Sequence, residues 1–130
     1  MEKLKSILVI IGGANLILWG LFHLTFWKAL DWKNELVKLT EINSNVMQML
    51  NIAVTVTLVA FGFIMIFYRN EVSNTALGRA LLIAFAIFWL ARLVGEIAFP
   101  GGSIGFGIVL FLCMLIYLIP AIIGDNAAKP

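Results

Sequence analysis

The stretch from Ala76 to Phe99 restricts this chain to few folds. It is almost wholly apolar, and it is long enough to cross a bilayer as a helix, which at about 1.5 Å per residue takes about 20 residues. It also carries Arg92 and Glu96, one helical turn apart. Charged side chains at membrane depth are costly, so they are rare and usually face a bundle interior or a water-filled cavity. The stretch therefore predicts a membrane-spanning helix that carries a polar site.

The composition of the whole chain indicates the same class of protein. Its 130 residues are 62% hydrophobic and 12% charged, with a mean hydropathy of +1.04. The apolar residues are gathered in long runs, which is typical of an integral membrane protein. The net charge of +2 is scattered along the sequence and does not favour a nucleic-acid partner. The lone cysteine, Cys113, excludes an internal disulfide and a cysteine-rich metal site.

Four apolar runs are long enough to span a bilayer, and they predict an all-α, integral membrane four-helix bundle that forms a single domain. The expected spans cover residues 4–27, 45–68, 76–99 and 104–123. The N-terminus begins like a signal peptide, with lysines before an apolar run, but the run continues past the length of a typical signal segment. We therefore interpret it as a retained first span.

The segment between the first two expected spans is too polar to cross a bilayer. Lysines alternate with acidic residues in it, while apolar residues recur at helical spacing. This pattern predicts a short amphipathic helix over residues 29–42 that lies at the membrane surface. Because its charges sum to zero, we expect only weak attraction to anionic lipid.

The other two connections carry turn signals. Residues 69–75 predict a polar loop, in which Asn74 or Thr75 could cap the helix that follows. Residues 100–103, PGGS, predict a tight turn that ends the third span. Pro120 near the end of the fourth span can break or kink that helix.

The connectivity of four spans brings three helix ends into one leaflet. The end of the first span, the start of the second and the end of the third must share that leaflet, whichever way the protein is inserted. Six polar or aromatic side chains fall at these ends. They are His23, Gln48, Asn51, Trp89, Arg92 and Glu96. Because lipid solvates such groups poorly, we expect the helices to turn them toward one another in a single cluster that includes an Arg92–Glu96 ion pair.

The distribution of lysine and arginine gives the expected orientation. More of them lie on the side of the two termini than on the opposite side, so the positive-inside rule favours cytoplasmic termini. This places the polar cluster in the outer half of the bilayer. The predicted location is a bacterial-type inner membrane or a plasma membrane, with the chain crossing it several times.

Three functions are compatible with the cluster. The first is a ligand-binding pocket in a transporter subunit or sensor, in which Arg92 fixes an anionic or hydrogen-bonding group while Glu96 and His23 titrate. The second is a scaffolding protein in which the same polar network only fixes helix packing. The third is a membrane enzyme that acts on a lipid-soluble substrate with His23 and Glu96 as its acid–base pair. No nucleophile or catalytic motif accompanies that pair, so we rank an enzyme last.

The sequence predicts no cofactor and no metal site. A single histidine supplies too few ligands for an ordinary zinc site or for bis-histidine haem. The expected partners are the lipid bilayer and a small-molecule ligand. Further copies of the chain are also expected, because four helices leave little room for a transport path between them.

Overall fold

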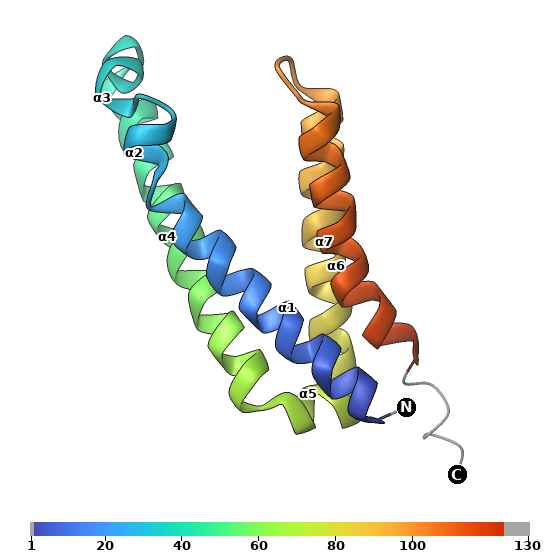
Figure 1. Ribbon diagram of the computed structural model, residues 1–130. Coiled ribbons are helices and arrows are strands. Elements are labelled where there is room, and N and C mark those ends of the chain that lie inside the picture. Colours follow the sequence, from blue (N-terminus) through green and yellow to red (C-terminus); the bar gives the residue numbers. More distant parts are fainter. Residues whose placement is uncertain (1, 124–130) are drawn as a thin grey trace. The chain divides into compact units, whose positions relative to one another are not determined.

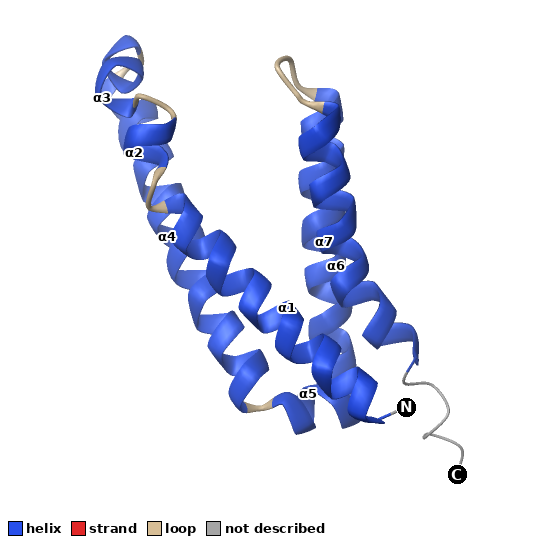
Figure 2. Ribbon diagram, viewed as in Figure 1, coloured by secondary structure: helices blue, strands red, loops and turns tan. Residues whose placement is uncertain are grey.

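The structure is a computed structural model that describes residues 2–123, and this part of the chain is helical, with no strand (Figures 1 and 2). Its four long helices are α1 (Glu2–His23), α4 (Glu41–Phe67), α6 (Ala76–Ala98) and α7 (Ile104–Ile123). Each is long and apolar enough to cross a membrane. The predicted all-α class and the four membrane-length helices are therefore confirmed, with ends that lie within a few residues of the expected ones.

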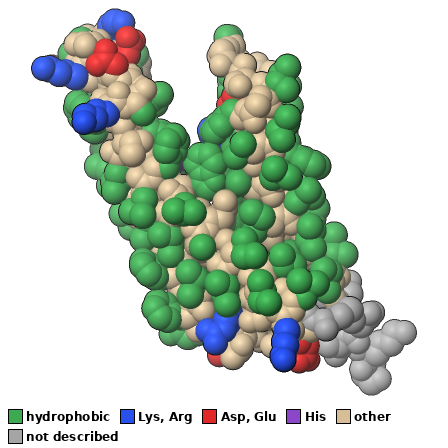
Figure 3. Space-filling model, viewed as in Figure 1, with side chains coloured by type: hydrophobic (Ala, Val, Ile, Leu, Met, Phe, Trp, Pro, Cys, Tyr) green, Lys and Arg blue, Asp and Glu red, His purple; other side chains and the backbone are tan. Residues whose placement is uncertain are grey.

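Side chains of different kinds occupy different parts of these helices. Large apolar side chains are exposed along all four of them. In the face shown in Figure 3, hydrophobic side chains cover the lengths of the helices, and the lysine, arginine, aspartate and glutamate side chains gather toward their ends. This is the distribution expected of helices whose lengths contact lipid and whose ends contact water.

The chain divides into two compact units. The central unit is Gly13–Ile64, and the terminal unit combines Met1–Gly12 with Met65–Pro130. Helices α1 and α4 therefore contribute to both units, whereas α6 and α7 belong to the terminal unit alone.

In the central unit, α1 packs closely against α4 at two glycines. A Cβ atom at Gly62 would lie 2.7 Å from the carbonyl oxygen of Gly13 and 2.6 Å from Cγ1 of Ile17. A Cβ atom at Gly20 would lie 2.7 Å from Cγ2 of Val59. Such distances leave no room for a side chain, so the glycines let the two helices approach, as small residues do between membrane helices.

The connection between α1 and α4 consists of short helical pieces where one amphipathic helix over 29–42 was expected. These pieces are α2 (Phe26–Ala29), α3 (Trp32–Glu35) and the 3-10 helix η1 (Leu36–Lys38). Asp31 separates the first two because its backbone is left-handed, with φ of 48°, a conformation that cannot continue a right-handed helix. Trp32 and Leu36 are nevertheless buried while their charged neighbours are exposed. Two of the three residues of the predicted apolar side are therefore buried without a continuous helix, whereas the third, Leu39, is 42% exposed.

In the terminal unit, α6 and α7 pack along each other as an antiparallel hairpin (Figure 1). The short helix α5 (Arg69–Asn74) precedes α6 and occupies the segment where a loop was expected. Thr75 ends α5 and caps α6, since its hydroxyl oxygen accepts the Gly78 N–H at 3.0 Å. One of the two predicted capping residues is thereby confirmed.

Tyr117 connects α7 to the first part of α1 within the terminal unit. Its side chain is fully buried, and its hydroxyl donates to the carbonyl oxygen of Gly12 at 2.7 Å. A Cβ atom at Gly12 would lie 3.0 Å from the Tyr117 ring, so the glycine leaves space for that ring. Three residues later, Pro120 is accommodated inside α7, and the helix continues to Ile123.

Candidate functional site

The six predicted site residues divide between the two units. His23, Gln48 and Asn51 belong to the central unit, and Trp89, Arg92 and Glu96 belong to the terminal unit. The structure therefore supports two smaller groups, one in each unit. A single cluster of six residues stays a prediction.

His23 and Asn51 form a reciprocal pair in the central unit. The Asn51 amide nitrogen donates to the carbonyl oxygen of His23 at 3.1 Å, and the Asn51 amide oxygen lies 2.7 Å from Nδ1 of the His23 ring. Because that oxygen can only accept, Nδ1 carries the proton. His23 is the last residue of α1, so its carbonyl lacks an intrahelical partner and Asn51 supplies one.

The other polar residues near this pair bond along their own helix. The Gln48 amide donates to the backbone oxygen of Ser44 at 3.2 Å, and the Thr55 hydroxyl donates to the backbone oxygen of Asn51 at 2.8 Å. An aromatic ring also covers the pair, since Phe26 has its centroid 4.5 Å from the His23 ring. In the central group, the His23–Asn51 bonds therefore join α1 to α4, whereas Gln48 and Thr55 bond within α4.

Two residues of the second group, Arg92 and Glu96, line a hollow at the turn between α6 and α7 in the terminal unit. The hollow has a volume of about 470 Å³ and is open on one side. Its charged lining residues are Arg92 and Glu96, and its aromatic lining residues are Phe88 and Phe99. The remaining wall is formed by Ala91, Gly95, Pro100, Gly101 and Gly102. We call this space the turn hollow.

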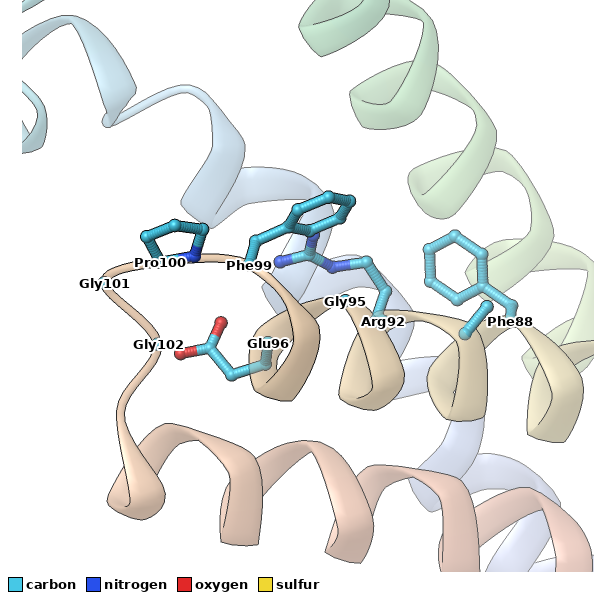
Figure 4. A pocket seen from close by; sticks show the side chains of 9 residues that line it. Phe88, Arg92, Gly95, Glu96, Phe99, Pro100, Gly101 and Gly102 are labelled. Atoms are coloured by element: carbon cyan, nitrogen blue, oxygen red, sulfur yellow. The ribbon is translucent and has the colours of Figure 1, made fainter.

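Glu96 is bound to the turn itself. Its carboxylate oxygen Oε1 accepts the backbone N–H of Ser103 at 2.7 Å, and Figure 4 shows the carboxylate directed to the loop at Gly102. A Cβ atom at Gly102 would collide with the carbonyl oxygen of Glu96. The turn therefore needs a glycine at that position, and the N–H bond holds the Glu96 side chain across it.

Arg92 points along α6 instead of pairing with Glu96. In Figure 4 its guanidinium lies beside Phe99, away from the Glu96 carboxylate. The structure shows an ion pair between Lys38 and Glu35, at 2.6 Å, and none between Arg92 and Glu96. The expected Arg92–Glu96 ion pair is thus corrected: the Ser103 N–H takes the carboxylate, and Arg92 is an exposed cation at the turn hollow.

Trp89 is not part of the lining of the turn hollow. It is 2% exposed, and its ring packs edge-to-face against Phe88 with centroids 5.3 Å apart. Trp89 therefore belongs to the core of the terminal unit. The aromatic residues that line the turn hollow are instead Phe88 and Phe99. The sequence signal for them is the PGGS turn, which fixes where α6 ends and which side chains of its last turns adjoin the loop.

Two further findings concern metal binding and similarity to known proteins. Within residues 2–123, no three histidine, cysteine, aspartate or glutamate side chains lie together as they would to hold a metal ion. Comparison of the chain with models of protein families, with curated proteins and with solved structures found no match.

Proposed function

We propose that the chain is a multi-pass membrane protein that binds a small anionic ligand in the turn hollow, as a transporter subunit or a sensor. The observation that carries the proposal is the exposed Arg92 in a concave, largely apolar site. Its guanidinium is available to a ligand, because no carboxylate among the described residues lies within salt-bridge distance of it. With four spans and cytoplasmic termini, the turn hollow opens on the outer side of the membrane.

The chemistry of the lining favours an anion with an apolar part. A guanidinium offers five N–H donors in a planar fork, which matches carboxylate and phosphate groups. Phe88 and Phe99 supply apolar walls on either side of Arg92 along α6. Small-molecule sites commonly combine apolar walls with a few polar groups that fix the ligand's orientation.

Calorimetric titration of the purified protein in a neutral detergent tests this function, with glycerol 3-phosphate as the anionic probe. We expect saturable binding that weakens at least about tenfold in Arg92→Ala, because a charge-assisted hydrogen bond contributes about 1.5–3 kcal/mol. Arg92→Lys should bind with intermediate affinity, since lysine keeps the charge but loses the planar fork.

Arg69→Ala is the matched control, because it removes an exposed arginine of the terminal unit that does not line the turn hollow. It should leave binding unchanged. Equal loss of affinity in Arg69→Ala and Arg92→Ala would show a diffuse charge effect, and probe binding that Arg92→Ala does not weaken would reject the proposal.

A scaffolding role is the second candidate, and the reciprocal His23–Asn51 bonds favour it. In that case the polar groups only hold helices together, as interhelical hydrogen bonds do in membrane proteins. Asn51→Ala would then lower the free energy of unfolding, whereas Arg92→Leu would leave it unchanged. Neither the unsubstituted protein nor Arg92→Leu would bind the probe. Probe binding that depends on Arg92 would exclude a purely architectural role.

A further inference from the structure

We infer that the ligand of the turn hollow is a zwitterion, with its anionic group on Arg92 and a neighbouring ammonium group on Glu96. This inference rests on the proposed function, since it names the class of ligand for the same site. Both charged residues line the one hollow, and they are not paired with each other. Two opposite charges held apart in a shared concave site match a ligand that carries both charges.

The spacing of the two charges follows from their positions on α6. Residues one turn apart on a helix have Cβ atoms about 5–6 Å apart, so they usually pair when their charges are opposite. Here the Ser103 N–H holds the Glu96 carboxylate across the turn, while Arg92 extends toward Phe99 (Figure 4). The turn therefore keeps the two charges separate, and a ligand can lie between them.

Glu96 retains the capacity to bind a cation. Its oxygen Oε1 accepts from Ser103, and a carboxylate has further lone pairs on both oxygens. Glu96 also lies in the last turn of α6, which ends at Ala98. The carbonyl groups at the C-terminus of a helix give a partial negative charge that favours a cation. The Glu96 carboxylate is therefore the main source of negative potential for an ammonium group, because the positive end of α7 at Ser103 offsets the α6 carbonyl groups.

The same two charges argue against a purely anionic ligand. A dianion placed on Arg92 would lie in the field of the Glu96 carboxylate, which has no cationic side chain within salt-bridge distance among the described residues. Because Arg92 and Glu96 lie one helical turn apart, well within the Debye length of about 8 Å at physiological salt, that repulsion is not fully screened. An ammonium group next to the anion converts the repulsion into attraction.

Two sources could supply this chemistry. One is a lipid headgroup with an ammonium and a phosphodiester, which is available because the turn hollow lies at the end of a helix long enough to cross the membrane. The other is a water-soluble zwitterion that reaches the hollow through its open side. Both would use Arg92 and Glu96 in the same way.

The test compares two soluble probes on the full-length protein by calorimetry. Phosphoethanolamine carries a phosphate and an ammonium group, whereas glycerol 3-phosphate carries the phosphate alone. We expect phosphoethanolamine to bind at least about tenfold more tightly in the unsubstituted protein. In Glu96→Gln that preference should fall to about twofold or less, since glutamine keeps an acceptor for the Ser103 N–H but loses the charge.

The outcomes separate the inference from the proposed function. If the unsubstituted protein bound the two probes with equal affinity and Arg92→Ala bound neither, the zwitterion inference would be overturned. The proposed anion site would stand. A preference for phosphoethanolamine that persists in Glu96→Gln would also overturn it. Binding of neither probe, or binding that Arg92→Ala does not weaken, would reject the proposed function as well.

A bilayer arm identifies the source of the ligand. The protein is placed in nanodiscs of phosphatidylglycerol, whose headgroup carries no ammonium group, with and without phosphatidylethanolamine, and the soluble probe is titrated into both. Weaker apparent binding of phosphoethanolamine in the nanodiscs that contain phosphatidylethanolamine supports a headgroup ligand, because the lipid competes for the same two residues. Unchanged binding supports a water-soluble zwitterion.

Discussion

The carboxylate of Glu96 accepts the backbone N–H of Ser103 at 2.7 Å, across the turn that joins α6 to α7. The two residues lie on opposite sides of Gly101 and Gly102, so this bond closes the turn and fixes where α7 begins. A negative charge at the first turn of a helix also interacts favourably with the helix dipole. The residue expected to titrate in a binding site is thus also the residue that holds the turn together.

Removal of the Glu96 carboxylate should destabilise the terminal unit. We expect Glu96→Ala to lower the free energy of unfolding by about 1–2 kcal/mol, because a hydrogen bond to a charged group is lost at a partly exposed site. Glu96→Gln should cost about half as much, since the amide oxygen can still accept the Ser103 N–H. Equilibrium unfolding in mixed detergent micelles measures both. Wild-type stability in Glu96→Ala would show that the bond does not hold the turn.

Gly102 should tolerate no side chain. A Cβ atom there would collide with the carbonyl oxygen of Glu96, so Gly102→Ala forces the backbone to move, and we expect a loss of about 1–3 kcal/mol in the free energy of unfolding. Gly105→Ala is the matched control, because its nearest contact would be the Ser103 hydroxyl at 3.8 Å. The control should be neutral or slightly stabilising, as alanine favours a helix over glycine. Similar stabilities for the two variants would contradict the close approach.

Features that depend on local sequence could be predicted well. The four long helices follow from the apolar character summed along each run, and this property does not depend on how the runs pack. The cap at Thr75 follows from a hydroxyl placed just before an apolar run. The amphipathic segment was predicted only in part, because the left-handed backbone of Asp31 interrupts the helix there. Aspartate tolerates that conformation, but helical spacing does not reveal it.

The candidate site was harder to predict because its pairing depends on the turn. Arg92 and Glu96 were expected to pair since they lie one helical turn apart. The competing partner is the Ser103 N–H, which reaches Glu96 only once the glycines have reversed the chain. The walls formed by Phe88 and Phe99 depend on the same reversal. Spacing along one helix therefore identified the two charges of the turn hollow and missed what each of them contacts.

The His23–Asn51 pair should contribute measurably to the stability of the central unit. A double-mutant cycle with His23→Ala, Asn51→Ala and the double variant gives the coupling energy between the two side chains. We expect about 0.5–2 kcal/mol, the range seen for hydrogen bonds between membrane helices. The coupling energy reports only the bond between the His23 ring and the Asn51 amide oxygen. The second bond does not contribute to it, because that bond uses the His23 backbone oxygen, which His23→Ala retains. A coupling energy near zero would show that the side chains do not hold each other.

The contact of α1 with α4 should depend on Gly62 and Gly20. An added Cβ atom at Gly62 would meet the backbone oxygen of Gly13 at 2.7 Å, and one at Gly20 would meet Val59 at the same distance. We expect each alanine variant to lower the free energy of unfolding by about 1–3 kcal/mol, because the helices must move apart. Gly62→Ala should cost more, since a backbone atom cannot turn aside as the Val59 side chain can.

Gly95→Ala serves as the control for this pair of variants, because its added Cβ atom would lie at an ordinary 3.7 Å from the Phe99 ring. It should be neutral or slightly stabilising in the same unfolding measurement. A distance measurement between spin labels on the exposed faces of α1 and α4 would show the separation of the helices directly. The distance should increase in Gly62→Ala and stay unchanged in Gly95→Ala. If Gly62→Ala and Gly95→Ala had equal stability and equal label distances, the two helices would have to be farther apart at Gly13 than the structure places them.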